Sequence, residues 1–408
     1  MQNCFDFAVI GGGAAGMAAS VSAAACGDQV LLIEKNNMLG RKIAASGNGR
    51  CNIMNSGNAG YYGDADFAGK VLEYYSKEHL IRFWNSLGIR LSEEDGGRMY
   101  PCTFHSTTVT DAYKISLNNA GVDIRLQTSV KSITKTGQNF LIRTDHETFK
   151  ASRILIACGG SASPKLGGTE SGYQLLADFG HSIVPVIPAL CPLKTDQKSI
   201  SGLFGIRTRC ETVLKDETGR PVIRQNGEIL FTKEGISGIC IMQTARFARK
   251  GYKIRLDLTG RIFEKQEELI QSLIHRQNQI GRWPPETLLY GILVPKLSYA
   301  VVKQSGIDMR GRNAGDLTYG EIKRIAETCM NYTLSVTGSS GMEDAQVTAG
   351  GADCSMFDPH TMESDIVSGL HAAGEVLNVD GDCGGYNLMF ATASGILAGL
   401  NGREEIIS

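Results

Sequence analysis

The first 35 residues constrain the fold of this chain more than any other stretch. The segment FDFAVIGGGAAGMAASVSAAACGDQVLLIEK opens with an apolar run, Phe7 to Ile10, that stops at a glycine, as a buried parallel strand does. The glycines that follow satisfy the pattern GxGxxG at Gly11, Gly13 and Gly16. The first permits a tight turn, the second lets the backbone approach a pyrophosphate, and the third lets the next helix pack closely on the sheet.

The residues after the glycines complete this pattern. Ala14 to Ala25 predicts a helix of small residues whose N-terminal amides point at phosphates, and Val30 to Ile33 predicts a second strand. Glu34 follows that strand, 18 residues after Gly16, where a carboxylate can bind a pair of ribose hydroxyls. Together these features predict a dinucleotide site, and the acid favours FAD or NAD over the phosphorylated ribose of NADP.

Two later segments favour FAD over NAD. ASRILIACGG, residues 151–160, predicts a strand over Ile154 to Ala157 that ends in a double glycine, where backbone passes near a ligand. Residues 369–399 predict a short strand ending at Gly374 and Glu375, a glycine-rich loop, and a helix that starts near Asn387. This second segment resembles the carboxyl-terminal part of two-dinucleotide-fold flavoproteins, in which an acid holds a ribityl hydroxyl and a helix N-terminus faces the flavin pyrimidine ring.

If both ends of the chain build one site, the residues between them are inserted. At 408 residues the chain is long enough for several packed units. After residue 187 the pattern changes to short β-like runs at 205–214, 220–231 and 252–258. An amphipathic helix at 264–280 and further helices to about 330 follow, before YTLSVTG at 332–338 returns as a strand.

The predicted fold class is therefore α/β with an insertion. A Rossmann-like FAD-binding domain in two segments holds an inserted β-barrel-like domain, in which a small helical domain is nested. The predicted boundaries are 1–187 and 346–408 for the FAD-binding domain, 188–262 and 332–345 for the β-rich domain, and 263–331 for the helical domain.

Charge is distributed unevenly along the chain. Residues 188–345 hold 23 Lys and Arg against 17 Asp and Glu, a net charge of +6, whereas the remainder carries −7. The basic insertion therefore favours an anionic partner. The eleven cysteines include no CxxC pair and no Cys/His cluster, so no metal site is predicted. Because no apolar run is long enough to span a bilayer and no targeting segment is recognisable, we expect a cytoplasmic protein without a membrane partner.

Six stretches together resemble the BaiN/RdsA-type family of NAD(P)/FAD-dependent oxidoreductases. They are GGGAAGMAA, GRKIAASGNGRCN, CGGSASPKLGGTESGYQLL, LFTKEGISG, VTAGGA and AAGEVLNVDGDCGGYNLMFATASG. The resemblance extends over essentially the whole chain, with one departure at Met54-Asn55, where the family has Thr-Asn. It implies one of two reductions by a flavin: dihydrouridine synthesis in large-subunit ribosomal RNA, or saturation of a carbon–carbon double bond in bile-acid-like steroids.

The resemblance also suggests a role for the loop at residues 40–52. In such flavoproteins this loop runs beneath the cofactor, from the phosphates near Arg41 and Lys42 to the ring system along Ser46 to Asn52. The predicted cofactor-binding residues are Gly11, Gly13, Ala14, Ala15, Gly16, Glu34, Lys35, Arg41, Lys42, Ser46, Gly47, Asn48, Gly49, Asn52, Val130, Ala157, Gly159, Gly160, Gly374, Glu375, Gly385, Asn387 and Leu388.

Both implied reactions need NAD(P)H as electron donor, a proton donor and groups that hold a carbonyl. We find no second GxGxxG, so the nicotinamide is expected to bind transiently. Cys51 is the first candidate acid, with Arg50 beside it lowering the thiol pKa, but structural burial is the more common role for such a cysteine. Tyr386 is the second candidate acid. Arg98 and His105 are lesser candidates.

Three functions remain open at this point. An RNA-modifying reductase predicts a basic groove, with phosphate contacts from Arg207, Arg209, Arg246 and Arg249. A small-molecule enone reductase predicts a closed apolar pocket over the flavin. A non-catalytic flavin redox sensor predicts no acid near the ring. The net charge of the insertion favours RNA, and the oligomeric state is not predicted.

Overall fold

The computed structural model describes residues 4–58 and 60–404, and the chain divides into two compact units. The first comprises Met1–Ile187 and Gln346–Ser408, and the second comprises Pro188–Ala345. The finer division of the second unit into a β-rich and a helical domain stays a prediction.

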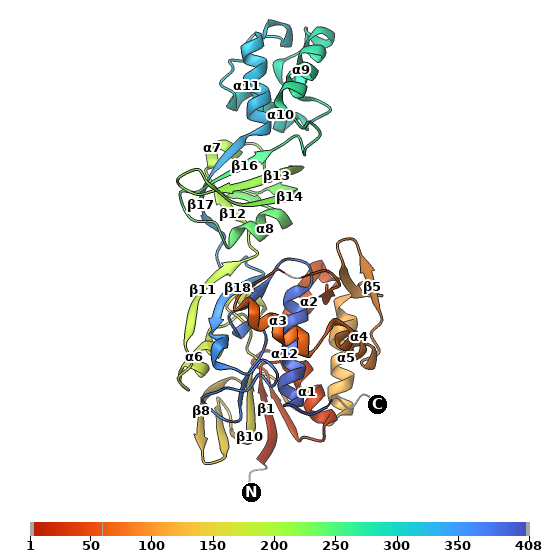
Figure 1. Ribbon diagram of the computed structural model, residues 1–408, viewed down its shortest axis with the longest axis vertical. Coiled ribbons are helices and arrows are strands. Elements are labelled where there is room, and N and C mark those ends of the chain that lie inside the picture. Colours follow the sequence, from red (N-terminus) through yellow and green to blue (C-terminus); the bar gives the residue numbers. More distant parts are fainter. Residues whose placement is uncertain (1–3, 59, 405–408) are drawn as a thin grey trace. The chain divides into compact units, whose positions relative to one another are not determined.

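A seven-stranded sheet lies at the centre of the first unit, in the order β7-β2-β1-β10-β9-β8, with β19 also paired to β10 (Figure 1). The predicted first and second strands are β1 and β2, which run parallel in register from Phe7 with Val30 to Ile10 with Ile33. The strands are β1 (Cys4–Ile10), β2 (Val30–Ile33), β7 (Asp123–Arg125), β8 (Val130–Thr136), β9 (Asn139–Thr144), β10 (Thr148–Ile156) and β19 (Leu370–Ala372).

The strands β1, β2, β10 and β19 are parallel, and the apolar residues Phe7–Val9, Leu31–Leu32, Ile154–Ile156 and Leu370 on them are fully buried. A continuous apolar run is what a parallel strand covered on both faces requires, and this explains why Phe7 to Ile10 could be recognised from the sequence. The order and the Gly-rich turn after β1 make this a Rossmann-like fold, which confirms the predicted α/β class.

Two long helices of small residues lie side by side on this sheet, α1 (Ala14–Ala25) and α12 (Tyr386–Leu400), as Figure 1 shows. Their close approach depends on glycine. A Cβ added at Gly395 would lie 2.2 Å from the Ala15 carbonyl oxygen, and one at Gly399 would lie 2.4 Å from that of Ala19. The two ends of the chain therefore pack as one layer, as the two-segment prediction requires.

Smaller elements complete the first unit. Two-stranded sheets pair β4 with β20 and β11 with β18, and β3, β6 and β5 form a third small sheet. These strands are β3 (Met54–Asn55), β4 (Tyr61–Gly63), β5 (Leu91–Glu94), β6 (Arg98–Pro101), β11 (Ile183–Ala189), β18 (Val347–Ala352) and β20 (Val379–Gly381). The further helices are α2 (Arg41–Ala45), α3 (Ala65–Tyr74), α4 (Lys77–Ser86), α5 (Ser106–Asn119) and α6 (Ser171–Ala177).

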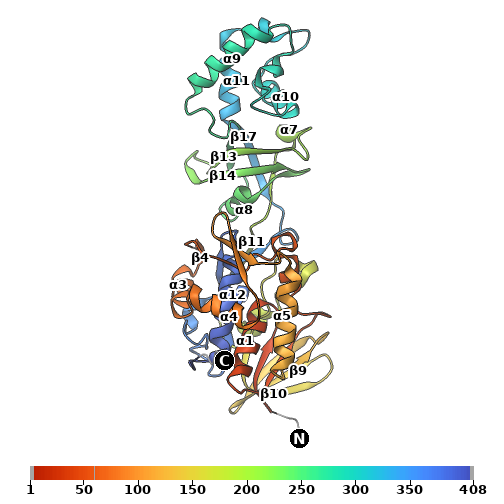
Figure 2. The same ribbon diagram turned by 90° about the vertical axis from the view of Figure 1, so that its right-hand side faces the viewer.

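The second unit contains a closed barrel in the order β12-β15-β14-β13-β16-β17. Figure 2 labels β13, β14 and β17 of this barrel. Three of its strands match the β-like runs of the sequence, namely β13 (Arg207–Lys215), β14 (Pro221–Phe231) and β16 (Lys253–Asp257), and β17 (Tyr332–Ser339) is the predicted returning strand. The strands β12 (Leu193–Thr195) and β15 (Gly235–Ser237) were not predicted, because three residues are too short to show a period of two.

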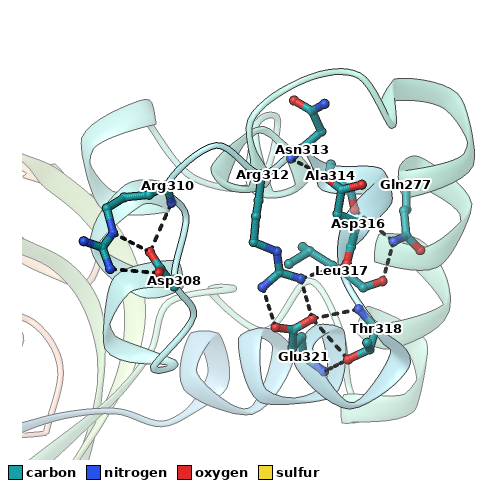
Figure 3. Close-up of polar contacts among 10 residues, drawn as sticks. All are labelled: Gln277, Asp308, Arg310, Arg312, Asn313, Ala314, Asp316, Leu317, Thr318 and Glu321. Atoms are coloured by element: carbon teal, nitrogen blue, oxygen red, sulfur yellow. Dashed lines mark hydrogen bonds and ion pairs between the residues drawn. The ribbon is translucent and has the colours of Figure 1, made fainter.

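Helices α9 (Gln266–Ile280), α10 (Pro295–Gln304) and α11 (Tyr319–Met330) form the rest of the second unit, together with α7 (Gln197–Ile200) and α8 (Ile239–Ala245). The loop before α11 is held by polar contacts, as Figure 3 shows. Arg312 donates to both Glu321 oxygens at 2.7 Å and 2.9 Å, and Gln277 donates to the carbonyls of Ala314 and Leu317.

The structure corrects one local prediction and adds two findings. The strand expected to end at Gly374 and Glu375 ends at Ala372, because Gly374 has a φ of 77°, which is incompatible with a strand. Gly374–Val376 forms a 3-10 turn instead. Across the described ranges, we find no helix with the length and apolar character that crossing a membrane would require. The same ranges hold no group of three His, Cys, Asp or Glu side chains arranged around a metal position.

Candidate cofactor site and active site

The three motif glycines have different reasons for being glycine. A Cβ at Gly11, whose φ is 113°, would lie 2.3 Å from the Ala157 carbonyl oxygen, and a Cβ at Gly16 would lie 1.9 Å from that of Gly11. These two positions are required by packing within the protein. A Cβ at Gly13 would instead meet no protein atom within 4 Å. The room beside Gly13 suits a pyrophosphate that approaches the backbone at the N-terminus of α1.

Glu34 lies at the carboxyl end of β2 beside this turn, and it is 8% exposed. Its Oε2 accepts the Gly12 amide at 2.7 Å and its Oε1 accepts the Asn36 amide at 2.8 Å. The Asn36 side chain also donates to Oε1, from Nδ2 at 2.5 Å. A carboxylate has about four acceptor positions, so one, on Oε2, remains for a ribose hydroxyl. The segment that leads to Val130, another predicted cofactor-binding residue, is also anchored to Glu34, since the Thr128 amide donates to the Glu34 backbone carbonyl.

Two basic residues follow among those predicted to bind the cofactor, Lys35 and Arg41. Burial lowers the pKa of Lys35 below its usual value. Arg41 is the first residue of α2, and its guanidinium donates to Asn36 Oδ1 and to the Lys165 carbonyl, both at 2.9 Å. Arg41 is therefore held beside the loop that follows Glu34.

The stretch SGNGRC, residues 46–51, has an unusual backbone. Ser46–Gly49 forms a 3-10 turn, and four residues of the stretch have positive φ angles: Gly47, Asn48, Gly49 and Cys51. Asn48 and Cys51 both have a φ of 56°, a conformation that costs about 1 kcal/mol or more for residues with a side chain. Strained backbone of this kind concentrates at ligand sites, which agrees with the predicted position beneath the cofactor.

The predicted effect of Arg50 on Cys51 is wrong. Burial raises the pKa of the Cys51 thiol to about 11, and the side chain is fully buried. The Arg50 guanidinium lies over the rings of Tyr100 and Phe104, 4.5 Å and 4.6 Å from their centroids, and pairs with Glu94 at 3.0 Å. The guanidinium therefore interacts with these two aromatic rings and not with the Cys51 thiol.

The C-terminal segment meets the loop after β10 at Glu375. Lys42 Nζ donates to Glu375 Oε2 at 3.0 Å, and the Thr348 amide donates to Oε1 at 2.9 Å. A Cβ at Gly160 would lie 2.7 Å from Glu375 Oε1, whereas one at Gly159 would meet nothing nearer than Oε2, at 4.0 Å. Lys42 thus contacts the predicted ribityl-binding acid directly, and open space remains beside Gly159.

The N-terminus of α12 closes the other side of the predicted site. Gly385 precedes it with a φ of 102°, and a Cβ there would lie 2.5 Å from the Met54 carbonyl and 2.7 Å from Asn52 Oδ1. Within the described ranges, Asn52 Oδ1 is buried and has no hydrogen-bond partner. The first amides of a helix, here including those of Asn387 and Leu388, have no intrahelical acceptor. An orphaned acceptor beside free amides fits a polar ligand.

The side chains of Asn387 and Tyr386 form hydrogen bonds with loop residues that precede α12 in the chain. Asn387 Nδ2 donates to the Gly381 carbonyl at 2.9 Å, and its Oδ1 accepts the Gly381 amide at 2.8 Å. The Tyr386 hydroxyl donates to the Asn58 carbonyl at 3.2 Å, and burial raises its pKa. Only the backbone of Asn387 is therefore left for a ligand.

The structure brings most of the predicted cofactor residues together and adds others. Gly374 joins the two segments, since a Cβ there would lie 2.9 Å from that of Ala15, next to Ala14 at the start of α1. Of the two lesser candidates, His105 is an exposed residue before α5. Arg98 donates to the Asp95 carbonyl, but its Cγ would lie only 3.8 Å from a Cβ at Gly384, next to Gly385. Sequence reasoning missed Thr348, Ser161 and Tyr173, which lie within the quoted motifs VTAGGA and CGGSASPKLGGTESGYQLL but carry no spacing signal.

The chain matches the family model described as HI0933-like protein Rossmann domain over residues 5–401. It belongs to the HI0933-like family. This family membership confirms the resemblance seen in the sequence, and it makes the protein an FAD-dependent oxidoreductase with FAD as its cofactor. The open face of Gly13 and the orphaned Asn52 oxygen are features of this chain that fit such a cofactor.

Two curated relatives within the HI0933-like family have different names. The chain is 34% identical over 412 residues to the 3-dehydro-bile acid delta(4,6)-reductase of Clostridium scindens, covering 97% of this chain and 98% of that protein. It is 28% identical over 398 residues to the ribosomal RNA dihydrouridine synthase of Escherichia coli, covering 96% of each.

Among solved structures, the chain resembles 3-ketosteroid-delta4-(5alpha)-dehydrogenase from Rhodococcus jostii RHA1. The TM-score is 0.51 at 16% identity, and the match covers 98% of this chain and 97% of that chain. At this level of identity the likeness concerns the fold. It agrees with the Rossmann-like architecture of the HI0933-like family.

Proposed function

We propose that this protein reduces a carbon–carbon double bond conjugated to a carbonyl in a small 3-oxo-steroid-like enone. The observation that carries the proposal is the 34% identity, along nearly the full length of both chains, to a bile-acid reductase. When bound, FAD supplies hydride transfer from a nicotinamide to the β-carbon of such an enone. NAD(P)H is the electron donor that we propose.

The residues of the chain would bind the cofactor and handle charge and protons. The α1 N-terminus and Glu34 would hold the dinucleotide, and the α12 N-terminus would stabilise negative charge on the cofactor through its dipole. Tyr386 is the proton donor that we propose, since its hydroxyl is protonated at neutral pH and stands at this helix N-terminus. Cys51, the first candidate acid in the sequence, is placed second here, because its complete burial agrees better with the structural alternative.

A uridine of large-subunit ribosomal RNA is the second candidate substrate. Two observations favour it: the net charge of +6 on residues 188–345 and the 28% identity to a ribosomal RNA dihydrouridine synthase. Several of the arginines in this segment are held in ion pairs within the second unit, however, and are not free to contact phosphates. Arg207 pairs with Glu228 at 2.7 Å, and Arg224 and Arg255 both pair with the buried Glu211. We therefore place the steroid-like enone first and RNA second, with a cytoplasmic location suiting either.

The third alternative, a non-catalytic flavin redox sensor, is set aside. The HI0933-like relatives named above are enzymes, and the chain covers almost their full length. The similarity to these enzymes extends over both segments of the first unit and over the insertion, and a sensor function would not explain it.

An anaerobic experiment separates the two substrates. The enzyme is reduced with NADPH and mixed with a 3-oxo-Δ4 steroid or with a large-subunit ribosomal RNA fragment, and flavin reoxidation is followed by absorbance. We expect rapid reoxidation by the steroid and a product two mass units heavier. Dihydrouridine formation without steroid turnover would replace the first substrate with the second, and reoxidation by neither would overturn both. In the same assay, Tyr386→Phe should slow reoxidation by substrate while leaving reduction by NADPH unchanged.

A further inference from the structure

Several polar groups around Glu375 were not among the residues predicted to bind the cofactor. Both carboxylate oxygens already accept hydrogen bonds, from Lys42 and from the Thr348 amide. Thr348 also accepts the Ala162 amide on its hydroxyl at 2.9 Å, so the chain segment around Ser161 is tied to the same acid. All these residues lie in the first unit, on α2, on β18, in the loop that follows β10 and in the 3-10 turn Gly374–Val376.

Two buried hydroxyls in this cluster have no partner. In the part of the chain that the structure describes, neither Ser161 Oγ nor the Tyr173 hydroxyl makes a hydrogen bond, and each residue is 6% exposed. They are neighbours: burial raises the pKa of Tyr173 to about 12, while the adjacent Ser161 and Thr348 side chains oppose that rise. Native proteins rarely leave a buried hydroxyl unpaired, so two beside one carboxylate call for a ligand.

There is room for such a ligand at the same place. A Cβ added at Gly159 would find no atom closer than Glu375 Oε2 at 4.0 Å, whereas one at Gly160 would be crowded by Thr348 Oγ1 at 2.4 Å. The open position, Gly159, thus faces the acid and lies two residues before Ser161 in the chain. Hydroxyls can both donate and accept, which suits the polyhydroxylated ribityl chain and the polar flavin edge.

We propose that Tyr173 and Ser161 bind FAD through their hydroxyls beside Gly159 and Glu375, and that Lys42 is a positioning residue that holds the Glu375 carboxylate in place. The inference concerns the cofactor and does not depend on the proposed substrate. A failure of the steroid or RNA assay would leave it intact.

The test compares FAD affinity with the stability of the apoprotein in the full chain. We expect Tyr173→Phe and Ser161→Ala each to weaken FAD binding about five- to tenfold, or about 1 to 1.4 kcal/mol, measured by quenching of FAD fluorescence. The melting temperature of the apoprotein should not fall, because neither variant removes a hydrogen bond made within the protein. Lys42→Met should weaken FAD binding as well, and Lys42→Arg should restore much of it.

Tyr332→Phe is the matched control. The Tyr332 hydroxyl is buried in the second unit and donates to the Ser199 carbonyl at 2.5 Å. Its removal should lower the apoprotein melting temperature and leave FAD affinity unchanged. The proposal is overturned if Tyr173→Phe and Ser161→Ala bind FAD like the wild type, or if they behave like this control. Should one variant fail to fold, the other decides.

Discussion

At the scale of single residues, two glycines of the GxGxxG motif differ in what surrounds them. Gly16 is crowded by the Gly11 carbonyl, whereas Gly13 faces open space and has an ordinary φ of −84°. The sequence motif already predicts different roles for them, the approach of a pyrophosphate at Gly13 and close helix packing at Gly16. The distances in the structure agree with this division between a glycine that the fold needs and one that only a bound cofactor needs.

This difference predicts opposite outcomes for two small substitutions. Gly13→Ala should leave the apoprotein as stable as the wild type and weaken FAD binding about tenfold or more, because the added methyl group occupies the approach of the pyrophosphate. Gly16→Ala should lower the melting temperature of the apoprotein itself. Thermal unfolding and FAD titration of both variants check this, and equal FAD affinity for Gly13→Ala and wild type would contradict it.

The pair Arg50 and Cys51 gives a second prediction at this scale. Because the guanidinium contacts Tyr100 and Phe104, Arg50→Ala should not change the rate at which iodoacetamide modifies Cys51. With a thiol pKa of about 11 and complete burial, Cys51 should react far more slowly than the exposed Cys102 in the same protein. Peptide-resolved mass spectrometry measures both rates, and slower labelling of Cys51 in Arg50→Ala would restore the original hypothesis.

At the scale of elements, helix ends are stabilised by contacts that follow local sequence. At the start of α11 the Thr318 and Glu321 side chains form a capping box, and Arg312 clamps Glu321 from the preceding loop, as seen in Figure 3. The pattern Thr-x-x-Glu at 318–321 is readable in the sequence. The arginine nine residues away is not, because its position depends on how the loop folds back.

The clamp makes the stability of this element depend on pH. Hydrogen bonds from Arg312 and the cap lower the pKa of Glu321 to about 2 from an ordinary value of 4.5. A lowered pKa means that the stabilisation is complete above about pH 4.5 and is lost as the pH falls toward 2. Glu321→Gln should therefore cost about 1 kcal/mol at pH 7 and almost nothing near pH 2.

Denaturant unfolding of wild type and Glu321→Gln across this pH range measures the difference. Glu327→Gln on the same helix is the control, since no side-chain ion pair involving Glu327 is found among the described residues. A difference between Glu321→Gln and wild type that persists unchanged at low pH would show that the carboxylate charge is unimportant here.

At the scale of the whole molecule, the FAD-binding unit is built from two segments separated by 158 residues, Pro188–Ala345. The two segments leave this unit on neighbouring strands, because β11 and β18 pair with each other. The first unit also has its own core, formed by residues from both segments such as Ile10, Leu155 and Phe390. It therefore meets the conditions for folding without the insertion.

Replacing residues 188–345 with a short Gly-Ser linker should give a protein that unfolds cooperatively and binds FAD within about threefold of the full chain. The shortened protein should lose substrate-dependent reoxidation if the insertion contributes to substrate binding. Absorbance of the purified protein and FAD titration check the first part, and a colourless, aggregated product would show that the two units depend on each other for folding.

The sequence by itself determined the features that depend on neighbours along the chain. The GxGxxG turn, Glu34 after β2, the helix Ala14 to Ala25 and the longer barrel strands all follow from spacing and periodicity within a few residues. Only the tertiary structure decided that Lys42 contacts Glu375, 333 positions away, and that Arg50 contacts two aromatic rings instead of Cys51. The unpaired hydroxyls of Ser161 and Tyr173 are likewise a feature that only the tertiary structure shows. Hydrogen bonds and desolvation act over a few ångströms in space, so their effects on charge and pKa appear only once distant segments have packed together.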